Sequence, residues 1–219
     1  MDTIKEMKQE AKEKGLTIKK TIEKTCLDIQ YDGDCESPRS WSNLGYFIIV
    51  DRNYNNPDKN EELREIIRKT GDEATSQEEH IRMIKENYEW ENSENKVIAI
   101  YPIVKYEHRG VAYSLGTKHG FDYSNNGFYI VTKENLIDYG VPNNEEDLKN
   151  FFCEDIIKQE LELYNSWLNG KVYSFMLYDN KGKVVDSCGG FYNIEDIREH
   201  LPEEWSKEDL QDYFKLREN

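Results

Sequence analysis

The chain has 219 residues, a hydrophobic content of 37% and a formal net charge of −15. That length is typical of one domain with attached segments. The fifteen Tyr contribute to the hydrophobic core, where their hydroxyl groups need hydrogen-bond partners. The acidic charge repels the phosphate backbone of nucleic acids, which argues against direct nucleic-acid binding. Because no stretch reaches the roughly 20 apolar residues of a membrane span and no signal pattern opens the chain, we expect a cytoplasmic protein without a membrane partner.

Charge is distributed unevenly along the chain. Residues 1–24 carry seven Lys against five acidic residues, so the remaining 195 residues hold a net charge of −17. Residues 3–14 are mostly polar and are followed by Gly15, a pattern that predicts a short helix. We therefore expect 1–24 to form a charged N-terminal helical extension.

The first half of the core domain, which we expect to span 25–192, alternates strands with a helical insertion at about 58–94. β-Branched and aromatic residues predict the strands, and apolar stripes at helical spacing predict the helices. Ser76 and Glu79 form the capping box of the second helix. In chain order we expect strands over 25–31 and 44–51, helices over 61–69 and 76–90, and an antiparallel meander of strands over 96–106, 111–115 and 127–132.

The second half contains the longest amphipathic pattern in the chain. Apolar residues recur at helical spacing over 144–169, and Gly170 ends the pattern. Hairpins separated by helices predict an α+β fold around a mostly antiparallel sheet. The expected elements are helices over 133–139 and 144–169, a hairpin of strands over 172–178 and 183–188, and acidic helices over 194–200 and 206–216 in the C-terminal segment 193–219.

The four cysteines are spaced too widely for a zinc site. We expect free thiols, as in a reducing compartment. Cys35 lies between Asp34 and Glu36, whose negative charges should raise its pKa and make it a poor nucleophile. Neither a metal nor a cofactor is predicted.

A polar loop over 32–45 supplies the first group of candidate site residues. Asp32, Asp34 and Glu36 alternate along an extended stretch, as oxygen ligands of Ca²⁺ or Mg²⁺ do. The later Gly and Glu of a calcium loop are missing, which favours carboxylates that cap turns, with Arg39 as a local salt partner. The candidates in this loop are Asp34, Glu36, Arg39, Trp41 and Asn43.

A second polar loop over 107–127 contains His108 and Asp122. A Glu107–His108 acid/base pair is chemically possible, but a solvated histidine in a hairpin turn is the favoured interpretation. His119 should lie about 20 Å from His108, a strand length away, which argues against one shared catalytic site.

A third candidate segment, 186–190, begins with Asp186 near the end of a predicted strand and ends with two glycines. Backbone amides there can form a small anion-binding nest, although a tight strand exit is the favoured interpretation. The sequence contains no nucleophile elbow, zinc-protease motif or dinucleotide fingerprint, so the commonest enzyme classes are not indicated.

The predicted helices carry an excess of carboxylates on their outer faces. Residues 61–94 hold eleven acids against five bases, and 144–169 hold seven against two. A row of exposed carboxylates can imitate nucleic-acid phosphates in a basic groove, although a simply solvated face is the alternative. The candidate partner-binding residues are Glu61, Glu62, Glu65, Glu78, Glu79, Glu154, Asp155, Glu203 and Glu204.

Three blocks of the sequence match a set of motifs in the same order. A first pattern, Asp-x-Glu-x-Pro-Arg-x-Trp-x-Asn-Leu-Gly, matches Asp34, Glu36, Pro38, Arg39, Trp41, Asn43, Leu44 and Gly45. A middle pattern is similar to His108, Gly110, Asp122, Gly127 and Phe128, but Phe121 replaces its Trp and Tyr123-Ser124 its Ser-Gly. The last, Asp-Ser-Cys-x-Gly-Phe-Tyr, matches Asp186, Ser187, Cys188, Gly190, Phe191 and Tyr192.

In these three blocks the chain resembles a family of uncharacterised proteins from phages, plasmids and other mobile elements. The resemblance implies a role in a bacterial host cell but no particular activity. Together with the acidic body, it favours an accessory protein that inhibits a basic, nucleic-acid-binding or defence protein of the host, of the anti-CRISPR or antirestriction type. One alternative is an enzyme, or a binder of a small ligand or metal, whose 32–45 and 107–127 loops converge on one pocket. A further alternative is a structural, virion-associated component. The oligomeric state is left open.

Overall fold

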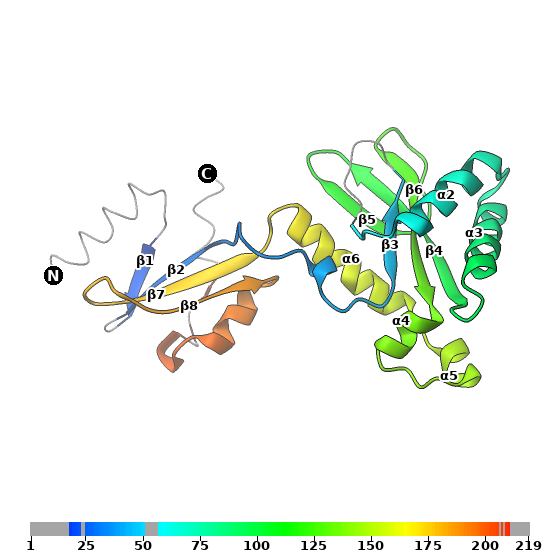
Figure 1. Ribbon diagram of the computed structural model, residues 1–219. Coiled ribbons are helices and arrows are strands. Elements are labelled where there is room, and N and C mark those ends of the chain that lie inside the picture. Colours follow the sequence, from blue (N-terminus) through cyan, green and yellow to red (C-terminus); the bar gives the residue numbers. More distant parts are fainter. Residues whose placement is uncertain (1–17, 23–24, 51–56, 206, 208, 211–219) are drawn as a thin grey trace. The chain divides into compact units, whose positions relative to one another are not determined.

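A computed structural model describes residues 18–22, 25–50, 57–205, 207 and 209–210. The fold is α+β, as predicted, with two four-stranded sheets in which the neighbouring strands are antiparallel (Figure 1). The chain divides into two compact units, which we name the central unit (Ser37–Asn165) and the terminal unit (Met1–Glu36 with Ser166–Asn219). This division differs from the expected 25–192 domain, because the first strand of that range belongs with the end of the chain.

The central unit holds most of the helices and one sheet. Its strands follow the order β3-β6-β4-β5. Its elements are η1 (Pro38–Ser40), β3 (Tyr46–Ile49), α2 (Glu61–Glu73), α3 (Gln77–Glu91), β4 (Val97–Glu107), β5 (Val111–Leu115), β6 (Tyr123–Thr132), α4 (Lys133–Asp138), α5 (Glu145–Asn150) and α6 (Glu154–Leu168), of which α6 continues past Asn165 into the terminal unit.

The strand order shows that the predicted meander is wrong. β4 pairs with both β5 and β6, so β6 lies on the far side of β4 from β5. Residues 116–122 make this crossing: the Gly116 amide donates to the Pro102 carbonyl, and the Glu107 amide donates to the Asp122 carbonyl. The alternating pattern identifies each strand, but the crossing loop decides which neighbours pair.

Helices cover both faces of this sheet (Figure 1). On one face, Ile48 and Phe128 join Leu63 of α2 and Ile84 of α3 in one buried cluster. On the other face the ring of Phe47 lies 5.6 Å, centroid to centroid, from Tyr164 of α6. Because successive residues of a strand point to opposite faces, β3 and β6 contribute side chains to both layers.

The predicted long helix over 144–169 is two helices, α5 and α6. Phe151 ends α5 with an extended backbone conformation, at φ −67° and ψ 123°. Its ring contacts Tyr139, and Cys153 is buried. The apolar spacing continues through the break, so tertiary packing at Phe151 and Cys153 outweighs the local helical pattern.

The terminal unit is built on the sheet β1-β2-β7-β8. Leu27, Phe175 and Trp205 are among the buried residues of its core, and the Trp205 indole donates to the Thr25 hydroxyl. Its elements are β1 (Ile18–Ile22), β2 (Thr25–Tyr31), β7 (Tyr173–Asp179), β8 (Val184–Phe191), η2 (Ile194–His200) and η3 (Glu203–Trp205).

Some of the elements predicted near the two ends of the chain lie partly or wholly outside the described residues. The expected extension 1–24 contributes β1, which pairs with β2. The helix predicted over 3–14 lies outside the described residues, as does most of the helix predicted over 206–216. Residues 194–200 form a 3-10 helix. Within the described ranges, the structure has no helix long and apolar enough to cross a membrane.

A close approach at Gly189 provides a test of the terminal unit. A Cβ there would lie 2.3 Å from Oδ2 of Asp32, whose carboxylate accepts from the amides of Gly190 and Asp34. We expect Gly189→Ala to lower the free energy of unfolding by about 1–3 kcal/mol, since Asp32 must move and lose these bonds. Gly33→Ala, where a Cβ meets nothing within 4 Å, is the control in urea titrations. Equal stability of the two variants would contradict this account.

Candidate functional site

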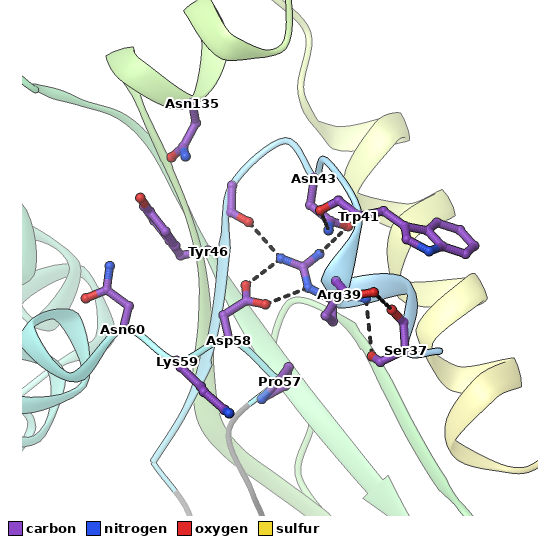
Figure 2. A pocket seen from close by; sticks show the side chains of 12 residues that line it. Ser37, Arg39, Trp41, Asn43, Tyr46, Pro57, Asp58, Lys59, Asn60 and Asn135 are labelled. Atoms are coloured by element: carbon purple, nitrogen blue, oxygen red, sulfur yellow. Dashed lines mark hydrogen bonds and ion pairs between the residues drawn. The ribbon is translucent and has the colours of Figure 1, made fainter. Parts of the chain in front are cut away.

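A hollow of about 800 Å³ in the central unit lies beside the first sequence block. Figure 2 shows Arg39 and Asp58 between the loop that precedes β3 and the segment that precedes α2. Residues of the loop 37–45 line it together with Tyr46, residues 57–60 and Asn135 of α4. This hollow is the candidate functional site.

Arg39 is buried at this site, with a side chain that is only 3% exposed. Its Nε and Nη2 donate to the two carboxylate oxygens of Asp58, at 2.9 and 2.5 Å. Nη1 donates to Asn43 Oδ1 and to Glu160 Oε2, at 2.9 and 2.8 Å, and Nη2 also donates to the Gly45 carbonyl at 2.7 Å. The five N–H groups of a guanidinium are therefore all engaged within the protein.

The two carboxylates that hold Arg39 also bind backbone amides. Asp58 accepts from the Phe47 amide at 2.6 Å, and Glu160 accepts from the Leu44 amide at 2.8 Å. Glu160 further accepts from the Tyr129 hydroxyl. The cluster thus joins the loop before β3, the segment before α2, strand β6 and helix α6.

Electrostatics keep Arg39 charged and Tyr129 neutral. Burial alone would lower the pKa of Arg39, but the hydrogen bonds and charge of Asp58 outweigh it and raise that pKa. Burial raises the pKa of Tyr129 far above its usual value; the nearby Arg39 opposes this rise, and Glu160 adds to it. One cation therefore faces two carboxylates and a neutral phenol.

Most residues of the first sequence block have a structural role here. Pro38 is buried, and Asn43 donates to the carbonyls of Pro38 and Trp41 while accepting from Arg39. At Gly45, a Cβ would lie 2.4 Å from the Ile130 carbonyl oxygen, so only glycine permits β3 to approach β6 this closely. Trp41 differs, because it is 50% exposed at the rim of the hollow.

Arg39 does not pair with the neighbouring acids, as the favoured interpretation of the sequence had expected. Its partners Asp58 and Glu160 are 19 and 121 residues away along the chain. Asp34 and Glu36 are instead exposed residues of the terminal unit. The sequence offered no spacing from which these distant partners could be identified.

The acidic stretch from Asp32 to Glu36 forms a turn. Asp32 Oδ1 accepts from the Asp34 amide and Oδ2 from the Gly190 amide, so an internal carboxylate already binds the backbone at the two glycines of β8. The part of the chain that is described contains no group of three or more His, Cys, Asp or Glu that could hold a metal ion. Asp186 is exposed and accepts from the next backbone amide.

The cysteines are free, as predicted. The pKa of Cys35 is raised, as expected, but burial is the largest cause, followed by the charge of Asp32. The thiol of Cys35 also contacts the Asp32 carbonyl. Cys35 therefore belongs to the turn and is poorly placed as a nucleophile.

His108 and Asp122 meet at the other end of β6 from Arg39. His108 Nδ1 lies 3.9 Å from Asp122 Oδ2, and both side chains are more than a third exposed. Asp122 directly precedes Tyr123, whereas Gly45 lies against Ile130, seven residues along the strand, or about 23 Å at 3.3 Å per residue. The hollow beside Arg39 is lined by residues of the 32–45 loop but not by His108 or Asp122.

The predicted acidic residues lie on exposed positions of several helices. Glu61, Glu62, Glu65 and Glu78 are exposed. Arg64 and Arg68 form ion pairs with Glu61 and Glu65 within α2, which offsets part of the charge. Three further members form ion pairs within their own helix, Glu79 with Arg82, and Glu154 and Asp155 with Lys158. The last two, Glu203 and Glu204, are exposed in η3.

Sequence reasoning missed several residues at the hollow. Tyr46, Lys59, Asn60 and Asn135 line it, yet none was a candidate. Asn60 directly precedes a predicted helix, and the preference for Asn at the N-cap position could have identified it. Comparison with family models, with curated proteins and with solved structures gives no match.

Removal of the Arg39 charge should destabilise the central unit. Arg39→Ala leaves Asp58 and Glu160 without their shared cation, and we expect a loss of about 3–5 kcal/mol in unfolding free energy. Arg39→Lys should recover only part of this loss, since an ammonium cannot reproduce the five-donor fork. Urea titrations followed by fluorescence measure both. Wild-type stability in Arg39→Ala would mean that this cluster does not hold the unit together.

The buried tyrosines give the central unit a defined sensitivity to base. Burial raises the pKa of Tyr129, and it raises that of Tyr88 to about 12, from an ordinary value of 10.0. Below pH 10 both states hold these protons; above it the unfolded chain loses them first, so stability falls as the pH rises from 10 towards 12.

Urea midpoints measured between pH 8 and pH 11 test this sensitivity. We expect a falling midpoint above pH 10 and a shallower fall in Tyr129→Phe, although that variant is less stable at pH 8 because it loses the Glu160 hydrogen bond. An identical slope in wild type and Tyr129→Phe would contradict the role given to Tyr129.

Proposed function

We propose that this protein is a non-enzymatic accessory protein of a phage or other mobile element. It binds and inhibits a host protein that has a basic, nucleic-acid-binding groove, such as a restriction or CRISPR component. The observation that carries the proposal is the outer surface of the α2–α3 pair in the central unit. The resemblance in the three sequence blocks supports the phage setting.

The α2–α3 pair uses its apolar side internally. Leu63, Ile66, Ile67, Ile84 and Tyr88 are buried against the sheet. The opposite side carries most of the charge: the two helices contain ten acidic residues and five basic ones. This excess of carboxylates is fixed on a rigid scaffold, which suits recognition of a basic groove.

Exposed tryptophans in the central unit, one of them on α3 itself, offer apolar contact area in addition to these charges. Trp90, near the end of α3, is 87% exposed, and Trp41 is half-exposed in the same unit. Exposed tryptophans are enriched among residues that dominate binding energy at protein interfaces. Carboxylates would then steer the encounter, while an aromatic anchor would supply short-range affinity.

The proposal predicts a basic partner whose binding is weakened by salt. Tagged protein, incubated with lysate of a bacterial host at about 0.1 and 0.5 M salt, should retain one stoichiometric partner only at the lower concentration, since salt screens exposed charges. The purified partner should bind DNA or RNA, and the protein should displace that nucleic acid. Capture of a partner that binds no nucleic acid would contradict the proposal.

Charge reversal locates the binding surface. We expect Glu61→Lys, Glu62→Lys and Glu65→Lys together to weaken binding at least about tenfold, because they replace attraction by repulsion. The matched control changes net charge equally on exposed residues of the terminal unit, with Asp34→Lys, Glu36→Lys and Asp186→Lys. Unchanged affinity in the α2 variant, or equal loss in both, would exclude this surface as the binding site.

A further inference from the structure

Two asparagines beside the hollow are held by helix termini through their oxygen atoms. Asn60 is the N-cap of α2, and its Oδ1 accepts from the Leu63 amide. Asn135 lies in the first turn of α4, and its Oδ1 accepts from the amide and hydroxyl of Thr132. Because an amide has one oxygen and one NH₂ group, this leaves both Nδ2 groups as donors.

Tyr46 lies between these two asparagines on the same side of the hollow (Figure 2). Among the described residues, none accepts a hydrogen bond from Asn60 Nδ2, Asn135 Nδ2 or the Tyr46 hydroxyl. The exposed Lys59 adds an ammonium group nearby. This side of the hollow therefore presents donors that a ligand with oxygen acceptors can satisfy.

The floor of the hollow presents little free charge. The donors of Arg39 are all engaged, and Asp58 forms an ion pair with that guanidinium. Lys59 is exposed, so solvent and salt screen its charge. An anion would gain little here, whereas a neutral, oxygen-rich molecule meets several fixed donors.

We propose that this hollow binds an uncharged small molecule rich in hydroxyl or carbonyl oxygens, the chemistry that saccharides and nucleosides share. Its oxygens accept hydrogen bonds from Asn60 Nδ2, Asn135 Nδ2 and the Tyr46 hydroxyl. A volume of about 800 Å³ is ample for a molecule of that size. The site uses none of the outer carboxylates of α2 and α3, so it stands independently of the proposed inhibitor function.

Nuclear magnetic resonance of the ¹⁵N-labelled full chain provides the direct test. Separate titrations use glucose, galactose and N-acetylglucosamine, then uridine, cytidine, adenosine and guanosine, each to about 10 mM, with inorganic phosphate as the anionic arm. We expect at least one neutral compound to shift the side-chain NH₂ signals of Asn60 and Asn135, and the responding panel identifies the source.

Variants that retain the fold remove one donor at a time. Asn60→Asp retains an N-cap oxygen for α2, and Asn135→Asp retains the acceptor for Thr132, yet both lose the NH₂ group. Tyr46→Phe removes only a hydroxyl. We expect each variant to weaken binding of the responding compound at least tenfold. Asn193→Asp, at the N-cap of η2 in the terminal unit, is the matched control and should bind as wild type does.

Three results would overturn the proposal. One is the absence of shifts at Asn60 and Asn135 with every neutral compound. Another is a response to phosphate alone, which would make the hollow an anion site. The third is unchanged affinity in Asn60→Asp and Tyr46→Phe. Because none of these experiments involves a protein partner, their outcome is separate from that of the charge-reversal experiment.

Discussion

The buried ion cluster of Arg39, Asp58 and Glu160 is the interaction on which the central unit depends. Burial of a guanidinium is costly unless its charge and all its donors are satisfied, and a surplus carboxylate in the same place adds to that cost. Here Asp58 and Glu160 pair with Arg39 and also accept backbone amides from Phe47 and Leu44. The cluster therefore fixes the entry of the chain into β3 as well as the position of α6.

The internal role of this cluster changes how the first polar block, over 32–45, should be interpreted. Polar and charged residues in a loop suggest a binding or catalytic site, but Arg39 and Asn43 are engaged internally. A guanidinium with no remaining donor is a poor ligand for an external anion. The groups available for recognition are instead Tyr46, Asn60 and Asn135, whose positions the cluster and the helix caps determine.

Local patterns predicted the elements well because they depend on short-range physics. The β5 strand over 111–115 and the hairpin of β7 and β8 follow from residue type and turn chemistry. The sequence did not predict the features that depend on packing between distant segments. These are the crossing at 116–122 and the break between α5 and α6. The geometry of the candidate site was not predicted for the same reason, because no sequence periodicity connects Arg39 with Glu160.

Helix α2 brings the two proposed sites onto one element. Its N-cap, Asn60, holds the helix through the Leu63 amide and faces the hollow, while Glu61 and Glu65 lie on its exposed side. Its inner side is fixed by Leu63, Ile66 and Ile67 in the buried cluster. Because these contacts hold α2 from within, Asn60→Asp leaves the outer carboxylates in place, and reversal of Glu65 leaves the cap in place. Each surface can therefore be altered while the other is retained, which makes the two functions separable by experiment.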